Sequence, residues 1–161
     1  MSRRSKIELA IAIEEPAWRK RWPSSKADIA KLLIAAAKHP ALVTKAIGVV
    51  SVVLADDATL QRLNRQFRGK DRPTNVLSFA DTVEPLGGIA VSYQTVSHEA
   101  ADQKKKFANH AKHMILHGFL HLLGHDHQVK KAARLMEGIE TAILDDLGIP
   151  NPYLIEKKPS A

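Results

Sequence analysis

The chain has 161 residues, of which 45% are hydrophobic and 25% are charged, the composition of an ordinary globular protein. It contains no cysteine, which excludes disulfide bonds and thiolate metal sites. The formal charge of +7 at pH 7 favours polyanionic partners, with RNA or DNA as the first candidate. A basic surface that serves only solubility is the alternative. Aromatic residues are only 5% of the chain, so stacking on an aromatic sheet face is not the expected mode of RNA binding.

The length predicts a single domain, residues 1–161, with a sizeable core. The N-terminal segment 1–15 has a short apolar run that contains Glu8, so it is too charged for a secretory signal. The longest uncharged apolar stretch, 46–55, is too short to span a bilayer. We therefore expect a soluble cytoplasmic protein without a membrane partner. The sequence does not indicate an oligomeric state.

Hydrophobic periodicity predicts an α/β (α+β) fold, a single mixed domain with a small central sheet of about four strands packed with helices. The first half is expected to contain a strand at 6–13, a helix at 26–38, a β-branched strand at 48–54 and a helix from 58 to 69. Trp18 and Trp22 follow the first strand, and we expect them to cover the core rather than to bind nucleobases.

The helix that closes at Gly69 is amphipathic, with Leu60, Leu63 and Phe67 on its predicted buried face. In the second half we expect strands at 76–79 and 86–91. We also expect a helix that runs from 96 to 108 and on into a stripe of histidines, and a last helix at 129–147.

The loop after Gly69 is strongly basic. Arg68, Lys70 and Arg72 place three cations within five residues, directly before the strand at 76–79. The planar guanidinium of arginine can donate two parallel hydrogen bonds to phosphate oxygens, so phosphate binding is one interpretation of this segment. A solvated turn in which Arg68 pairs with Asp71 is the other, and the sequence favours neither.

Four of the eight histidines fall within residues 117–127 (HGFLHLLGHDH). His117 and His121 are four residues apart, which on a helix places both imidazoles on one face. Gly124 can adopt the left-handed conformation that ends a helix. The chain can then reverse and bring His127 back toward the pair. The pattern predicts three imidazoles around one point.

Three neutral imidazoles suit zinc and leave a fourth position for water, the arrangement of a catalytic rather than a structural site. The spacing matches zincins that extend HExxH with a glycine and a third histidine. The general-base Glu of those proteases is replaced here by Gly118. The predicted ligand set is therefore retained without the protease's base, which favours metal-assisted hydrolysis of a substrate other than a peptide.

Other polar residues compete for roles near this site. His125 could replace His127 as third ligand, although the spacing favours His127. Asp126 could orient a ligand histidine or cap the next helix. His110 and His113 lie on the same helical stripe, and we expect them to be buried polar residues or to support the ligands.

These segments resemble the YbeY family of bacterial endoribonucleases and rRNA maturation factors. The resemblance rests on residues 68–79 (RGKDRPTNVLSF), 86–89 (LGGI) and 117–127, with further similarity at 55–57 and 147–153. It covers a core from 49 to 153, roughly two-thirds of the chain.

The resemblance implies one zinc ion held by His117, His121 and His127 on a zincin-like metal helix, with Arg68 in the active cleft. It also implies cleavage of single-stranded RNA, in 16S rRNA 3′-end processing and ribosome quality control. The partners would be rRNA in the small ribosomal subunit and ribosome-associated proteins. The chain departs from the family's usual sequence at three positions: His125 (usually Tyr), Gly88 (usually Asp) and Ala80 (often Pro).

The leading hypothesis is a zinc-dependent endoribonuclease in which Arg68, with Lys70 and Arg72, binds the substrate and stabilises charge on phosphorus. The nucleophile is either metal-bound water or the RNA 2′-OH. One alternative is a non-catalytic RNA-binding ribosome-assembly factor with a structural metal. A metalloprotease is a further alternative, disfavoured by Gly118.

Overall fold

A computed structural model describes residues 5–42, 45–80, 86–125 and 129–154. Its four strands form one mixed sheet in the order β1-β2-β4-β3. Strands β1, β2 and β4 are parallel, and β3 is an antiparallel edge strand beside β4. Their bounds are β1 Lys6–Ile13, β2 Ile47–Ala55, β3 Val76–Ala80 and β4 Leu86–Ser92.

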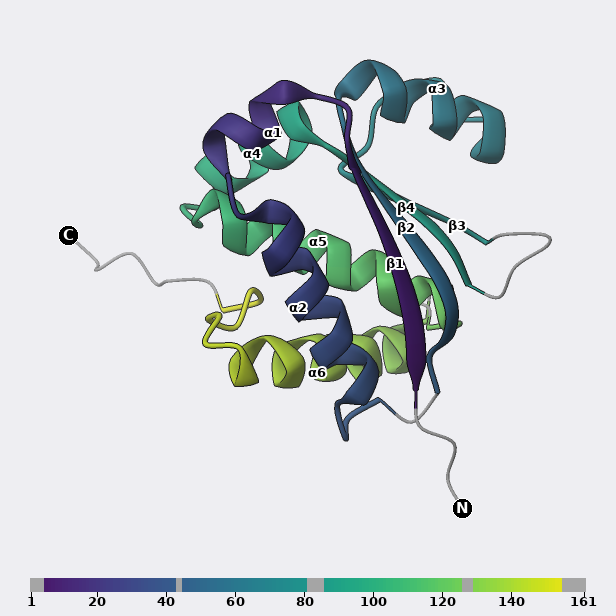
Figure 1. The fold of residues 1–161 in the computed structure, drawn as a ribbon, viewed down its shortest axis with the longest axis vertical. Coiled ribbons are helices and arrows are strands. Elements are labelled where there is room, and N and C mark those ends of the chain that lie inside the picture. The colour runs from purple at the N-terminus through teal and green to yellow at the C-terminus, as the bar shows by residue number, and fades with distance from the viewer. Residues whose placement is uncertain (1–4, 43–44, 81–85, 126–128, 155–161) are drawn as a thin grey trace.

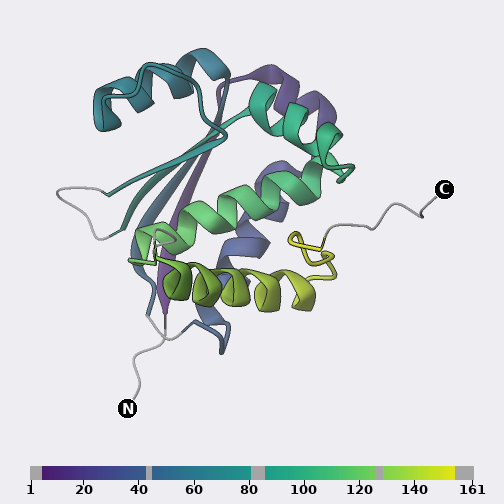
Figure 2. The same ribbon diagram turned by 180° about the vertical axis from the view of Figure 1, so that it is seen from behind.

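Six helices surround this sheet in the described part of the chain. Figures 1 and 2 show α5 and α2 running across one side of the sheet, with α6 packed beside α5. Helix α3 lies at the end of the molecule farthest from α6 (Figure 1). Their bounds are α1 Pro16–Arg21, α2 Ser25–Lys38, α3 Asp57–Arg68, α4 Tyr93–Asp102, α5 Phe107–Leu122 and α6 Lys130–Asp146.

The two faces of the sheet carry cores of very different size. Because side chains alternate along a strand, Val52 and Leu54 of β2 enter the large core under α2 and α5. Val53 and Ala55 face the other way, into a small cluster with Leu60 of α3. The helix that bears the histidines is therefore held by the main core, and α3 by a minor one.

The predicted α/β fold is confirmed, including all four strands. The tryptophans do cover the core: Trp18 is fully buried, and its indole Nε1 donates to the Ala55 carbonyl at 2.9 Å. Helix α1, on which Trp18 lies, was not predicted. No helix among the described residues is long and apolar enough to cross a membrane.

Two expectations were wrong. The helix expected from 96 into the histidine stripe is two helices, α4 and α5, because the chain turns between them and Lys104 adopts a left-handed φ of 54°. Phe67 was expected on the buried face of α3 but is 54% exposed. The buried residues of α3 are Leu60 and Asn64, so its core-facing surface ends one turn before Phe67.

Candidate metal centre

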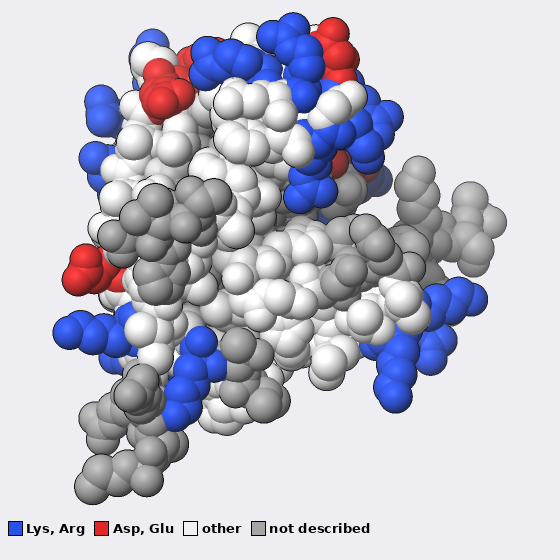
Figure 3. Space-filling view, turned by 90° about the vertical axis from the view of Figure 1, so that its right-hand side faces the viewer, with Lys and Arg blue, Asp and Glu red and all other residues white. Residues whose placement is uncertain are grey.

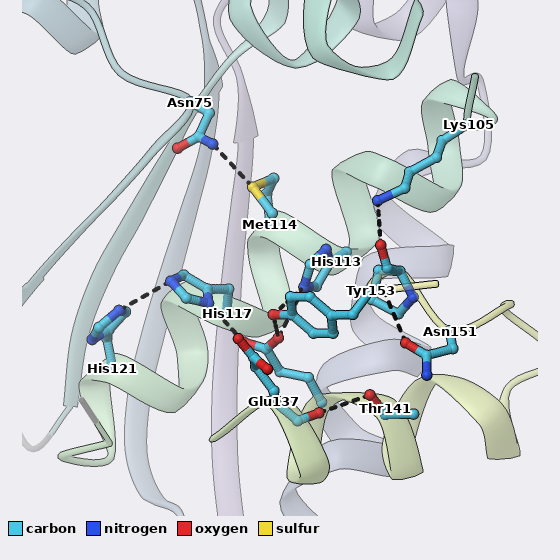
Figure 4. Close-up of polar contacts among 12 residues, drawn as sticks. Asn75, Lys105, His113, Met114, His117, His121, Glu137, Thr141, Asn151 and Tyr153 are labelled. Carbon is cyan, nitrogen blue, oxygen red and sulfur yellow. Dashed lines mark hydrogen bonds and ion pairs between the residues drawn. The ribbon is translucent and has the colours of Figure 1, made fainter. Parts of the chain in front are cut away.

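Helix α5 ends just beyond its two predicted ligands. His117 and His121 lie one turn apart, and their side chains point toward each other (Figure 4). Gly124 has a φ of 92°, the left-handed conformation expected from the sequence. Its N–H donates to the carbonyl of His121, and the next N–H, of His125, donates to the carbonyl of Leu120, both at 3.0 Å. This turn ends the helix and redirects the chain.

The two imidazoles converge on a shared point. The Nε2 atoms of His117 and His121 are 3.1 Å apart. Two nitrogens bound to one tetrahedral zinc at about 2.0–2.1 Å lie roughly 3.3 Å apart. The pair therefore fits a zinc ion with little adjustment.

The third ligand is not fixed by the described residues. Among them, no group of three His, Cys, Asp or Glu side chains converges in a way that could hold a metal ion. His125 therefore does not complete the pair formed by His117 and His121. His127, the predicted third ligand, and Asp126 lie outside the described residues.

A buried carboxylate on α6 orients the first of these histidines. Glu140 is fully buried, and its Oε1 accepts a hydrogen bond from Nδ1 of His117 at 2.6 Å. Its Oε2 accepts from Nε2 of His113 at 2.9 Å and from the hydroxyl of Tyr153. Burial alone would raise the pKa of Glu140, but the hydrogen bonds from His113 and His117 lower it to about 2. Glu140 is therefore ionised at neutral pH.

This contact decides which nitrogen of His117 carries the proton. An ionised carboxylate only accepts hydrogen bonds, so Nδ1 of His117 is the donor. In the neutral ring the Nε2 lone pair is then directed toward His121, where a metal would bind. The two Nε2 atoms thus fit a zinc ion in their spacing, and His117 also fits it in its tautomer. The sequence reasoning missed Glu140, because nothing in the spacing of α6 distinguishes it from other helical acids.

His110 and His113 are 3% and 6% exposed, which confirms that they are buried polar residues. Nε2 of His110 is 3.0 Å from Oε1 of Glu99, and burial lowers the pKa of His110 despite this carboxylate. The Asn75 amide donates to Glu99 and contacts Sδ of Met114 at 3.2 Å (Figure 4). Asn75 thereby links the start of β3 to α5.

Gly118 is buried where α5 crosses the sheet. A Cβ at this position would lie 2.8 Å from Oγ of Ser78 and 2.9 Å from Cγ2 of Ile89. The Ser78 hydroxyl also donates to the Gly118 carbonyl at 2.8 Å. A side chain here would force Ser78, Ile89 or the helix to shift, so the packing disfavours a general-base Glu at this position.

The basic loop is held against α3 by side-chain hydrogen bonds and an ion pair. The Asn64 amide donates to the carbonyl of Arg72 at 2.9 Å, and the Gln61 amide donates to Asp71 at 3.0 Å. Asp71 lies 3.9 Å from Arg65. Among the described residues, Asp71 therefore pairs with Arg65 and not with Arg68, the partner that the solvated-turn interpretation assumed.

Arg68, Lys70 and Arg72 are all exposed. Figure 3 shows Lys and Arg gathered at the upper end of the molecule, where Figure 1 places α3. The histidine pair lies on α5, which packs against the opposite face of the sheet from α3. The segment from Gly69 to Asn75 joins the two faces, since Asn64 holds it on the α3 side and Asn75 reaches α5.

Comparisons with known proteins show to which family the chain belongs. The family model described as "Endoribonuclease YbeY" matches residues 13–148. A protein named endoribonuclease YbeY from Paramagnetospirillum magneticum is 46% identical over 160 residues, covering 91% of this chain and 96% of that protein. Its counterpart from Magnetococcus marinus is 49% identical over 121 residues, covering 65% and 82%.

The solution structure of TM1509 from Thermotoga maritima has a similar fold, with a TM-score of 0.54 and 24% sequence identity over 94% of this chain and 99% of that one. The family model spans most of the chain, and the alignment with the Paramagnetospirillum relative covers nearly the full length of both proteins. The chain therefore belongs to the YbeY family of endoribonucleases.

Proposed function

We propose that this protein cleaves single-stranded RNA at one zinc ion held by His117, His121 and His127. The observation that carries the proposal is the pair of Nε2 atoms 3.1 Å apart, with the proton of His117 fixed on the opposite nitrogen by Glu140. Family membership supports RNA as the substrate. A zinc ion bound here would act as a Lewis acid on a phosphate oxygen and would lower the pKa of a bound water.

The protein's own groups have separate tasks in this scheme. Glu140 orients His117 and accepts a hydrogen bond from its Nδ1, so that Nε2 is the nitrogen that would bind the metal. Arg68, with Lys70 and Arg72, binds phosphates and offsets the negative charge that builds up on phosphorus. Because the segment from Gly69 to Asn75 links α3 to α5, we propose that the RNA runs along it from the cations to the histidines. The nucleophile is a water molecule or the RNA 2′-OH.

The biological role that we propose is 3′-end maturation of 16S rRNA and quality control of small ribosomal subunits in the cytoplasm, with rRNA and ribosome-associated proteins as partners. Support comes from the family resemblance and from the net charge of +7. A protease function is disfavoured by the packing at Gly118.

The test is cleavage of matched single-stranded and duplex RNA by wild type and Arg68→Ala, with and without a chelator. We expect cleavage of the single strand only, its loss with chelator, its recovery with zinc, and a reduction of about 10²–10³-fold in kcat for Arg68→Ala. A 2′,3′-cyclic phosphate end would identify the 2′-OH as nucleophile. If wild type binds the RNA but does not cleave it with any added metal ion, the hypothesis of a non-catalytic assembly factor replaces this proposal.

A further inference from the structure

Two phenylalanine rings stack on the α3 side of the sheet. The rings of Phe67 and Phe79 have centroids 5.5 Å apart and planes only 5° from parallel. Phe67 lies in the last turn of α3 and is 54% exposed, while Phe79 lies on β3 and is half-buried. The outer ring of the pair is therefore presented to solvent.

The backbone beneath the pair fixes its position. A Cβ at Gly88 would overlap the Phe79 ring at Cε2 and Cζ. The ring therefore rests directly on the sheet, where only glycine leaves room for it. Phe79 is held between the sheet and Phe67, so the exposed ring has a firm support.

Three cations lie within five residues of Phe67 in the chain. Arg68 follows Phe67 in the chain, and Lys70 and Arg72 lie in the loop that Asn64 ties to α3. A ligand that combines negative charge with flat apolar faces complements this surface. Single-stranded RNA has both, because its unpaired bases can stack on aromatic side chains while its phosphates contact Arg and Lys.

We propose that Phe67, supported by Phe79, is a stacking platform for an unpaired base of the RNA whose phosphates contact Arg68, Lys70 and Arg72. The inference rests on the proposed function and deepens it, because a platform for unpaired bases gives a physical reason for preferring single strands over duplexes. The low aromatic content argued against stacking on an aromatic sheet face, and the proposed platform is instead a single exposed ring at the end of helix α3.

The test measures binding of a fluorescent single strand of 2′-O-methyl nucleotides, and of an abasic strand of the same length, by anisotropy over a range of salt. We expect Phe67→Ala to weaken binding of the first strand on the order of tenfold and to leave the abasic strand and the salt dependence unchanged. Phe67→Tyr should restore binding. Arg68→Ala should instead weaken both strands and flatten the salt dependence.

Leu135→Ala is the matched control, because Leu135 is also a large hydrophobic residue, 61% exposed, on α6. It should bind both strands as wild type does. If Phe67→Ala binds both strands like wild type, or weakens both equally, the stacking platform is wrong while the proposed function stands. If wild type itself binds neither strand, the proposed function fails along with the platform.

Discussion

Replacing Glu140 with glutamine tests whether this carboxylate prepares His117 for a metal. The carboxylate accepts hydrogen bonds from His113, His117 and Tyr153. A glutamine side chain has a single oxygen, and its amide nitrogen only donates. At least one of the three donors then loses its acceptor in a fully buried site.

The expected damage to metal binding follows from this exchange. If the amide nitrogen faces His117, it donates to Nδ1, and the proton of the neutral ring moves to Nε2, the atom proposed to bind zinc. Replacement of a group that orients a histidine ligand typically weakens metal affinity about 10–100-fold, or about 1.4–2.8 kcal/mol. This agrees with the roughly 1.5–3 kcal/mol of a hydrogen bond to a charged group.

The assay is zinc titration against a chromophoric chelator at pH 7.5, which needs no RNA and no turnover. Glu137→Gln is the control, because Glu137 lies on the same helix at an exposed position and loses the same charge. We expect weaker zinc binding by Glu140→Gln and unchanged binding by Glu137→Gln. If Glu140→Gln remains folded and binds zinc as tightly as wild type, the argument that Glu140 fixes the proton on His117 is refuted.

Three further predictions follow from the packing, the helix caps and the ligands. Gly118→Ala should lower the free energy of unfolding by about 1–3 kcal/mol because its Cβ meets Ser78. Gly138 on α6 has open space around it, so Gly138→Ala should instead raise the free energy of unfolding by about 0.5–1 kcal/mol. Both variants are measured by urea titration, and equal effects would contradict the packing argument. Asp56 caps α3 by accepting from the Thr59 N–H at 2.9 Å, which lowers the pKa of its carboxyl below the usual 3.8. Its contribution is therefore complete above about pH 4 and is lost as pH falls through the lowered pKa. Asp56→Ala should lose about 1 kcal/mol at pH 7, and Asp56→Asn should keep the cap but lack this acid-dependent loss. Zinc affinity should fall below about pH 6, because protons compete with metal for imidazole, and metal content that stayed constant from pH 8 to pH 5 would argue against histidine ligands.

The strands and the C-terminal end of α5 were predictable because each carries a local signal. The β-branched run of β2 and the alternation of β1 identify strands without knowledge of their partners. Gly69 and Gly124 stand where the helix ends require a left-handed residue, with φ of 67° and 92°. The i, i+4 spacing of His117 and His121 was enough to bring their Nε2 atoms together.

The supporting contacts could not be read from the sequence because they join distant segments. Glu140 is 23 residues from His117, and the two meet only when α6 packs against α5. The exposure of Phe67 depends on where the minor core under α3 ends, which hydrophobic spacing along a single helix does not specify. The sequence showed that Gly118 occupies the position of the proteases' general base. Its close packing against Ser78 and Ile89 became apparent only in the structure.

The most direct test of the metal centre is the zinc content and RNA cleavage of the same preparations of wild type, His121→Ala and His98→Ala. His98 is exposed on α4, so His98→Ala controls for the loss of an imidazole. We predict one zinc per chain and full cleavage for wild type and His98→Ala. His121→Ala should be folded but should bind little zinc and cut no RNA. A His121→Ala protein that kept both its zinc and its cleavage activity would contradict the account.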